Sequence, residues 1–235
     1  GADFSLFKNI SGTVEYYKRK SKDLLYYKEL PLSSQVGTAT GMNTNLGDIE
    51  NYGFEVSLKV GIINTKDFRW NVDANWSSLT NKITYLPGGE YTYADRTATY
   101  KMAEGHSRYE FFMPSSAGVD SQTGNAMYWI KNNSGSWEKT SNWSDVSTDD
   151  YQWQGSALPK GFGSLTNNFQ YKGFDLSAML YYSYGSKMLD YIYCERVTLR
   201  GGVGVIQDLV KDRWQEPGDN AYLPRWSNDD YSRTR

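Results

Sequence analysis

Cysteine and histidine are almost absent from this sequence. Among 235 residues there is one cysteine, Cys194, and one histidine, His106. A single cysteine cannot form an intrachain disulfide, and a single histidine cannot build a histidine-rich metal site or supply both groups of a proton relay. We therefore expect no metal site and no bound cofactor.

An excess of charge of either sign is also missing. The chain has 25 Lys and Arg against 27 Asp and Glu, which gives a formal net charge of −2. Such a weak charge provides no electrostatic footprint for a phosphate backbone. We expect no nucleic-acid partner.

Long apolar runs are missing as well. No stretch of about 18 apolar residues is present, which excludes a transmembrane helix, and the first residues show neither the basic nor the apolar region of a signal peptide. A membrane β-barrel is not excluded, because its strands alternate lipid-facing and lumen-facing residues and have a low average hydropathy. The mean hydropathy of −0.67 is compatible with that class.

Catalytic signatures are absent. The sequence contains no Ser/His/Asp triad pattern, Cys/His pair, Walker loop or dinucleotide fingerprint. Two carboxylate doublets, Asp149-Asp150 and Asp229-Asp230, lie in loop-like stretches, where solvated charges are a better interpretation than a glycosidase pair or a calcium site. The glycine-rich residues 201–204 lack a preceding strand and indicate a flexible loop. We expect that the chain is not an enzyme.

Aromatic residues and glycine are abundant, with 20 Tyr, 8 Trp and 22 Gly. This composition suits strands and turns and predicts an all-β fold. The clearest strand is residues 68–76, in which apolar and polar side chains alternate strictly. Nine residues at about 3.3 Å each, tilted by about 45°, rise about 21 Å, close to the apolar band of about 25 Å in an outer-membrane barrel.

The same alternation continues in neighbouring strands. Residues 54–60 pair with 68–76 across a connection at 61–67, and residues 163–171 pair with 174–184 across a turn at Lys172-Gly173. A third pair is expected between residues 4–8 and 13–20, joined across 9–12. We predict that twelve side chains of the apolar faces contact lipid: Phe54, Val56, Leu58, Val60, Phe68, Trp70, Val72, Ala74, Trp76, Leu176, Ala178 and Leu180.

The lengths of the connections separate a barrel from a soluble β-sandwich, which would show the same alternation. Short turns are followed by long stretches at residues 29–48, 87–107 and from 186 onward, as in transmembrane barrels with short periplasmic turns and long extracellular loops. Parity then requires an even number of crossings between residues 76 and 163. Either residues 111–117 and 126–130 both cross, or neither crosses and the whole segment is one large loop.

Two weaker patterns complete this description. Aromatic residues lie near strand ends, where a barrel has its aromatic girdle, although sandwich-core or surface positions are the alternative: Tyr16, Tyr17, Trp70, Trp76, Tyr171, Tyr182 and Tyr184. Residues 203–214 have apolar positions at roughly helical spacing, ended by Pro217-Gly218, and predict a short loop helix.

A series of short motifs runs along nearly the whole chain. The motifs are RKSKDLL at residues 19–25, NYGFE at 51–55, NKI at 81–83, EG at 104–105, FF at 111–112 and AGVD with TG at 117–124. Near the end stand YKGFDL at 171–176, YYSYG at 181–185, RW at 213–214, PGD at 217–219 and PR at 224–225. Each motif is weak alone, but together and in this order they are specific. This order resembles the SusC/RagA family of TonB-linked outer-membrane transporters.

The chain departs from the family pattern in three respects. His106-Ser107-Arg108 replaces small residues and proline after Glu-Gly, and Glu110 stands where small or aromatic residues are common. Residues 134–154 look like an insertion peculiar to this chain. The plug, the TonB-contacting segment and the closing C-terminal strand of the family are not recognised, so residues 1–235 are expected to be part of one barrel domain of roughly 22 strands.

The resemblance implies active import of oligosaccharides or oligopeptides at the outer membrane of a Gram-negative bacterium. A SusD-like surface lipoprotein would cover the barrel, and TonB would supply energy through the plug. The alternatives are a soluble carbohydrate-binding β-sandwich and a passive porin-like outer-membrane protein. Within the insertion we predict contact with substrate or lid for four aromatic residues, against the alternative that they pack on one another: Trp137, Trp143, Tyr151 and Trp153.

Overall fold

A computed structural model describes residues 1–29, 33, 41–45, 47–87, 89–95, 98–193 and 211–226. The chain divides into two compact units. The first unit comprises Gly1–Tyr93, Lys101–Glu110 and Gly155–Lys187, and the second comprises Ala94–Tyr100, Phe111–Gln154 and Met188–Arg235. Within the described residues, no helical segment is long and apolar enough to span a bilayer.

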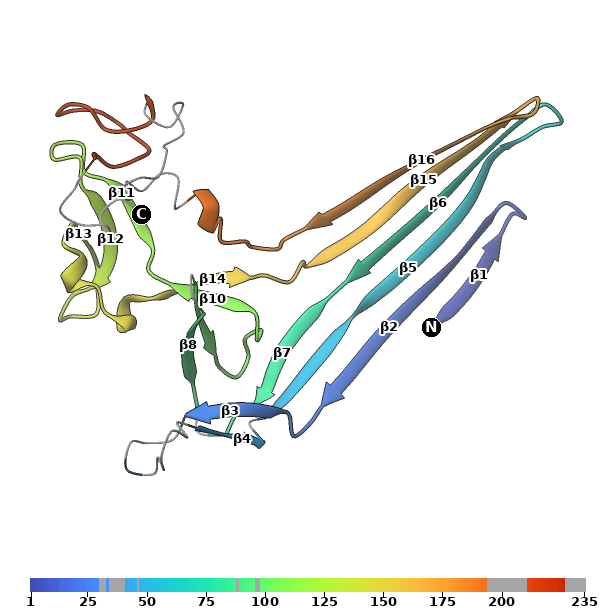
Figure 1. Ribbon diagram of the computed structural model, residues 1–235. Helices are drawn as coiled ribbons and strands as arrows, with labels where there is room; N and C mark the ends of the chain where they lie inside the picture. The colour runs from blue at the N-terminus through green and yellow to red at the C-terminus, as the bar shows by residue number, and fades with distance from the viewer. Residues whose placement is uncertain are drawn as a thin grey trace. The chain divides into compact units, whose positions relative to one another are not determined.

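The first unit is built on a seven-stranded antiparallel sheet with the order β1-β2-β5-β6-β15-β16, in which β7 also pairs with β5. Its long strands lie side by side as an open sheet (Figure 1). The strands are β1 (Ala2–Leu6), β2 (Ile10–Ser21), β5 (Asp48–Asn64), β6 (Phe68–Ser78), β7 (Thr80–Tyr85), β15 (Gly161–Tyr171) and β16 (Phe174–Tyr184). A separate pair in the same unit is β3 (Leu25–Glu29) with β4 (Gly41–Asn45).

The register places the predicted apolar positions of the long strands on one face. Val72 lies opposite Val60 of β5 and Asn167 of β15. Directly opposed residues, and alternate residues along a strand, share a face of a sheet. All twelve residues predicted from the alternation therefore lie on a common face, together with Leu165 and Phe169.

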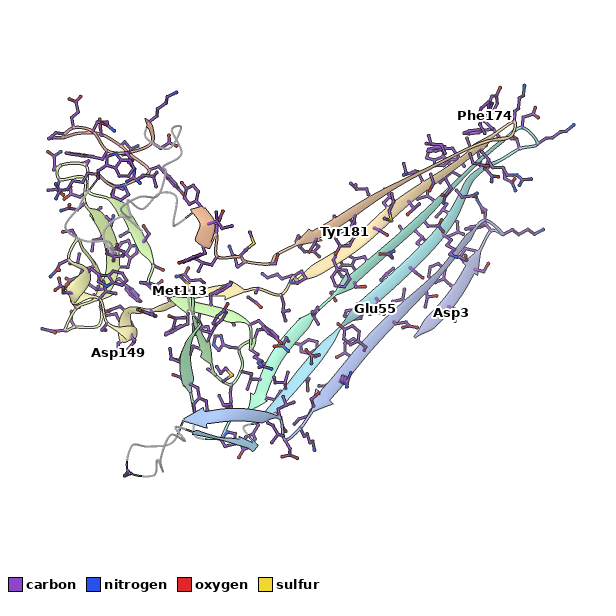
Figure 2. All side chains as sticks on the ribbon, viewed as in Figure 1. Asp3, Glu55, Met113, Asp149, Phe174 and Tyr181 are labelled. Atoms are coloured by element: carbon purple, nitrogen blue, oxygen red, sulfur yellow. The ribbon has the colours of Figure 1, made fainter. Side chains whose placement is uncertain are left out.

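The opposite face of the sheet is mostly polar, although it also carries Phe162, Met179 and Tyr181. It carries Glu55, Ser57, Asn71, Asp73 and Asn75 at positions that alternate with the apolar ones. Asp3 and Glu55, labelled in Figure 2, belong to this polar face. The predicted binary pattern of the strands is confirmed.

The turns show where the predicted boundaries were right and where they were wrong. Lys172 and Gly173 have φ of 44° and 89° and form the predicted two-residue turn between β15 and β16. The turn between β1 and β2 comprises residues 7–9, with φ of 52° at Phe7 and 62° at Lys8, and not residues 9–12. Phe7 is an unusual turn residue because left-handed backbone disfavours bulky side chains, so the sequence pattern did not reveal it.

The connection between β5 and β6 is also shorter than predicted. Residues 61–64 continue β5, with a register shift between Gly61 and Ile63, so the turn comprises only residues 65–67. Thr65 closes it, since its hydroxyl donates to the Phe68 carbonyl oxygen over 2.8 Å. A bulge of this kind interrupts the alternation locally and looks like a loop in the sequence.

Aromatic side chains border the apolar face at both ends of the sheet. Near the short turns, the Phe68 and Tyr171 rings are 6.5 Å apart and Trp70 stacks on Phe169 at 5.5 Å. Phe174 lies at this turn end (Figure 2). Toward the other end, a second aromatic group consists of Tyr16, Phe54, Trp76 and Tyr184, in which Tyr16 and Phe54 are 5.1 Å apart and Trp76 donates to the Tyr184 hydroxyl over 3.2 Å. The middle of the face is aliphatic.

The pairing of β6 with β15 decides between the two parity alternatives. These strands are direct neighbours, from Phe68 opposite Tyr171 to Ser78 opposite Gly161. Of the strands between them in sequence, only β7 joins this sheet, where it pairs with β5 beyond the end of β6. Neither of the two candidate segments is a strand of this sheet, and residues 79–160 form one long insertion between its adjacent strands β6 and β15.

Shorter strands make up the remainder. One sheet has the order β14-β10-β9-β8 and another the order β11-β12-β13. The elements are β8 (Tyr91–Asp95), β9 (Ala98–Met102), β10 (Glu110–Met113), β11 (Ser116–Val119), β12 (Ala126–Lys131), β13 (Trp137–Thr140), β14 (Gln152–Ser156) and the 3₁₀ helices η2 (Trp143–Asp145) and η3 (Thr148–Asp150). Most of the predicted helix at residues 203–214 lies outside the described residues; at its end, Arg213 forms a bridge with Leu223.

Candidate functional site

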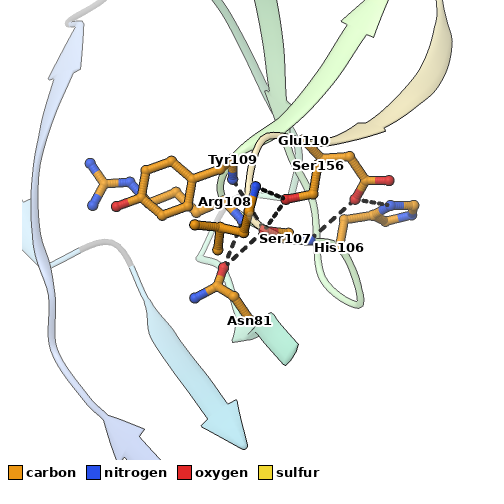
Figure 3. A network of polar contacts seen from close by, with 8 residues as sticks. Asn81, His106, Ser107, Arg108, Tyr109, Glu110 and Ser156 are labelled. Atoms are coloured by element: carbon orange, nitrogen blue, oxygen red, sulfur yellow. Dashed lines mark hydrogen bonds and ion pairs between the residues drawn. The ribbon is translucent and has the colours of Figure 1, made fainter. Parts of the chain in front are cut away.

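The insertion is anchored to the sheet in the first unit by a polar network around Asn81 of β7 (Figure 3). The Asn81 amide nitrogen donates to the Asn51 side chain over 2.7 Å. The Asn81 amide oxygen accepts from the Ser107 hydroxyl at 3.1 Å and from the Arg108 backbone N–H at 3.0 Å. The Ser156 hydroxyl reaches Ser107 at 3.3 Å. One asparagine thus holds β5, β7 and the turn at residues 106–109 together.

Two residues that depart from the family pattern contact each other in this network. Glu110 accepts the Ser107 backbone N–H at 3.2 Å, and the same carboxylate oxygen lies 3.2 Å from Nδ1 of His106. The preceding Gly105 has φ of +89° and donates its N–H to the Ile83 carbonyl oxygen at 2.9 Å. The left-handed backbone at Gly105 therefore favours glycine at this motif position. The residues that follow Gly105, His106 and Ser107, are held by their contacts with Glu110.

We expect Asn81→Ala to loosen the base of the insertion, because it removes the acceptor for Ser107 and Arg108 together. Loss of a partly buried hydrogen-bonding group costs about 1–3 kcal/mol. Backbone amides of residues 104–110 should then exchange with deuterium about tenfold faster or more in the full-length protein. Thr80→Ala is the matched control, since the exposed Thr80 side chain makes no hydrogen bond within the described residues. Equal exchange in both variants would show that Asn81 has no such role.

The polar face of the sheet carries a chain of side-chain hydrogen bonds across three strands. Asn168 of β15 donates to the Asp73 carboxylate of β6 over 3.0 Å and accepts from the Ser177 hydroxyl of β16 over 2.8 Å. One row away, Asn75 donates to the Ser164 hydroxyl over 2.8 Å. This pattern of mainly amide and hydroxyl groups fits a hydrated polar surface more than a binding centre with charges of one sign.

In the second unit, motifs distant in sequence meet around one tight loop. The Asp120 carboxylate accepts the Gln122 backbone N–H at 2.9 Å and the Thr123 hydroxyl at 2.7 Å. These hydrogen bonds hold the pKa of Asp120 below its usual range, so the carboxylate is ionised at neutral pH and the loop keeps its acceptor.

The segment at residues 213–225 clamps this loop. Trp214 donates its indole N–H to the Ser121 carbonyl oxygen at 2.9 Å, and Arg225 donates its backbone N–H to the Gly124 carbonyl oxygen at 2.8 Å. Asp219 closes the clamp by accepting the N–H groups of Gln215 and Glu216, which lower its pKa. The sequence motifs AGVD, TG, RW, PGD and PR therefore belong to a single structural cluster.

Arg213 is the most deeply buried polar residue of this cluster. Its side chain is 1% exposed, donates to the Pro224 carbonyl oxygen at 2.9 Å and stacks 3.6 Å from the centre of the Trp226 ring. Burial lowers the pKa of its guanidinium. A group with so little solvent contact stabilises the cluster rather than contacting a ligand.

The four aromatic residues predicted to contact substrate or lid fall into two groups. Trp143 packs edge-on against Tyr128 at 4.9 Å, and Tyr151 and Trp153 both pack against Phe112, at 5.9 Å and 5.2 Å. Trp137 on β13 is 43% exposed. Three of the four thus have partners inside the second unit, and Trp137 presents the largest accessible surface among them.

Sequence reasoning did not single out Trp129, Lys131 and Lys139, which flank Trp137 on β12 and β13. It also missed Asn81 as the centre of the anchoring network, although NKI was one of the motifs. The register of β12 and β13 could have revealed the two lysines and Trp129. The role of Asn81 depends on contacts between segments far apart in the chain, which leave no local signal.

Comparison with known proteins gives sequence relatives over nearly the whole chain. The chain is 28% identical over 248 residues to TonB-dependent receptor P3 of Formosa agariphila, covering 96% of the chain and 23% of that receptor. It is 37% identical over 91 residues to TonB-dependent receptor SusC of Bacteroides thetaiotaomicron, covering 38% of the chain and 9% of SusC. No protein-family model matches the sequence.

Solved structures show the same fold. The RagAB peptide transporter matches with a TM-score of 0.76 at 23% identity, over 93% of this chain and 24% of the matched one. The RagAB peptide importer in a closed-closed state matches with a TM-score of 0.74 at 24% identity. The chain spans about a quarter of the length of these relatives. The predicted resemblance and the antiparallel fold class are confirmed, although the described strands form an open sheet and not a closed barrel.

Proposed function

We propose that residues 1–235 form part of the barrel wall of a TonB-dependent transporter in the outer membrane of a Gram-negative bacterium. The transporter imports oligosaccharides or oligopeptides, a SusD-like surface lipoprotein covers it, and TonB acts through a plug supplied by the rest of the protein. The observation that carries this proposal is the sheet of the first unit, which is apolar on one face, polar on the other and bordered by aromatic rings at both ends.

Exposure of the apolar face favours lipid as its neighbour. Leu176 and Leu180 are each 63% exposed, and Phe174 is 79% exposed. A soluble β-sandwich would bury such residues under a second sheet packed about 10 Å away. Within the described part of the first unit no second sheet covers this face, so the sandwich alternative lacks support. The aliphatic centre of this face suits the hydrocarbon core of a bilayer, and its aromatic borders suit the two membrane interfaces.

The end of the sheet at which residues 79–160 depart favours an extracellular location for this insertion. The three short turns of the large sheet lie at one end, as Figure 1 shows, and residues 79–160 leave and return at the other end. Outer-membrane barrels have short periplasmic turns and long extracellular loops. The second unit would then contribute to the outer surface that meets lid and substrate.

Energy dependence separates this function from a passive porin. We expect cells that carry the full-length gene to take up or grow on its native oligosaccharide or peptide, and we expect uptake to stop when TonB is inactivated. The lipoprotein encoded with it should co-purify from detergent extracts. Uptake that continues without TonB, at unchanged surface abundance, would favour a passive pore and contradict the proposal.

A further inference from the structure

Two tryptophans and two lysines share one face of the β12–β13 strand pair in the second unit. Trp129 lies opposite Lys139, and Lys131 lies opposite Trp137. Because opposed and alternate residues share a face, these four side chains form one surface, which we call the Trp–Lys face. The two Trp–Lys pairs follow each other at a spacing of two residues, about 7 Å.

The Trp–Lys face is the outer face of this strand pair. On the opposite side, Tyr128 is only 5% exposed and packs against Trp143. Trp137, by contrast, is 43% exposed and lies on β13, at the edge of its sheet. A half-exposed indole ring on an edge strand is accessible to an external ligand.

Each lysine lies over a tryptophan ring and not against a carboxylate. The Lys131 ammonium is 5.2 Å from the centre of the Trp137 ring, and the Lys139 ammonium is 5.1 Å from that of Trp129. Lys139 also donates to the Ala117 carbonyl oxygen at 3.4 Å. Within the described residues neither ammonium forms an ion pair with a carboxylate, so two positive charges remain for an external anion.

Glu138 lies between Trp137 and Lys139 but belongs to the opposite face of β13, where it is paired with Ile130. The other nearby carboxylate, Asp150, is already engaged in hydrogen bonds. It is 4% exposed and accepts the backbone N–H of Lys131 at 2.7 Å and both the N–H and the hydroxyl of Ser147 at 2.8 and 2.9 Å. Its role is to hold the end of β12 against η3. Its carboxylate interacts electrostatically with the Lys131 ammonium but forms no salt bridge with it, so it offsets only part of the positive charge of the Trp–Lys face.

We propose that the Trp–Lys face binds an anionic oligosaccharide, a sugar chain that carries carboxylate or sulfate groups. This inference rests on the proposed import function and names the substrate class. Sugar rings present flat apolar faces that stack on indole rings, and the anionic groups pair with the lysines. A neutral glycan would leave both ammonium groups unused, and an acidic peptide would use the charges without needing two ring faces at a regular spacing.

The test uses the full-length protein in detergent and four probes. Oligogalacturonate and heparin-derived oligosaccharides carry carboxylate and sulfate groups, dextrin oligosaccharides are neutral, and poly-glutamate is an acidic peptide. Affinity is measured by calorimetry for the wild type, for the double variant Lys131→Gln with Lys139→Gln, and for Trp137→Ala. Lys172→Gln is the matched control, because Lys172 lies 5.4 Å over the Tyr171 ring at a short turn of the first unit.

We expect at least one of the two anionic oligosaccharides to bind, and the double variant and Trp137→Ala each to weaken it about tenfold or more. Binding should also fall with salt, and Lys172→Gln should leave it unchanged. Unchanged affinity in both test variants would overturn the proposal, as would tighter binding of dextrin or poly-glutamate. TonB-dependent uptake is measured separately, so a transporter that imports without binding either anionic probe disproves this inference and leaves the import function standing.

Discussion

Replacing Val72 by arginine should prevent most of the full-length protein from folding in the outer membrane. Val72 is central on β6, and its neighbours across the strands are Val60 and Asn167 on the apolar face. An arginine on the lipid face near the middle of the bilayer costs about 2–4 kcal/mol. The folded fraction can be measured by the shift in electrophoretic mobility between heated and unheated outer-membrane samples.

The control differs by one position along the same strand. Asn71 lies on the polar face opposite Gly61 and Asn168, so Asn71→Arg should remain hydrated in the lumen and lose far less folded protein. Leu58→Arg and Ser57→Arg on β5 repeat the comparison on a second strand. If the apolar and polar positions tolerated arginine equally, the apolar face could not be facing lipid.

Replacing Gly124 by alanine should disrupt the cluster that the RW and PR motifs form around residues 120–125. A Cβ atom at Gly124 would lie 2.4 Å from Cδ2 of Trp214, and φ of +70° is itself unfavourable for a side chain. The Trp214 ring would have to move, with loss of its hydrogen bond to Ser121. Strain in the backbone costs about 1–2 kcal/mol, and the steric conflict adds about 1–3 kcal/mol.

Gly118→Ala isolates the steric part of this effect. Gly118 also has a left-handed backbone, with φ of +92°, but a Cβ there meets nothing within 4 Å. Protease cleavage within residues 111–154 and 213–226 should be much faster in Gly124→Ala than in Gly118→Ala, and association with the lipoprotein lid should weaken only in the former. Similar cleavage in the two variants would mean that contact between Gly124 and Trp214 is unimportant.

Much of the large sheet could be predicted because the alternation of apolar and polar residues is visible within each strand by itself. The alternation in residues 68–76 and 174–184 identifies both the strand and its apolar face, and the register then brings those faces together. The turn at Lys172-Gly173 was equally visible, since glycine tolerates left-handed backbone. The three-residue turn at residues 7–9 has left-handed backbone at Phe7 and Lys8 without any glycine, and nothing local distinguishes these two residues from strand residues.

The insertion was less predictable because its structure depends on distant partners. Trp143 and Trp153 were predicted to contact substrate or lid, and the structure adds that their rings pack on Tyr128 and Phe112, which the sequence did not reveal. Trp214 and Ser121 lie far apart in the chain and share a hydrogen bond, and no periodic pattern encodes such a pair. The family motifs indicated that these residues matter but not that they meet.

The adjacency of β6 and β15 has a consequence for how such a protein can diversify. The two strands hold their register through eleven opposed pairs, and the Leu79 N–H meets the Lys160 carbonyl oxygen at 3.2 Å where the insertion departs and returns. Lengthening a loop whose ends are already fixed costs little, about 0.6 kcal/mol for each doubling. Because β7 itself pairs with β5 in the sheet, the part of the insertion beyond Tyr85 is the part whose length and sequence can change at little cost to the sheet.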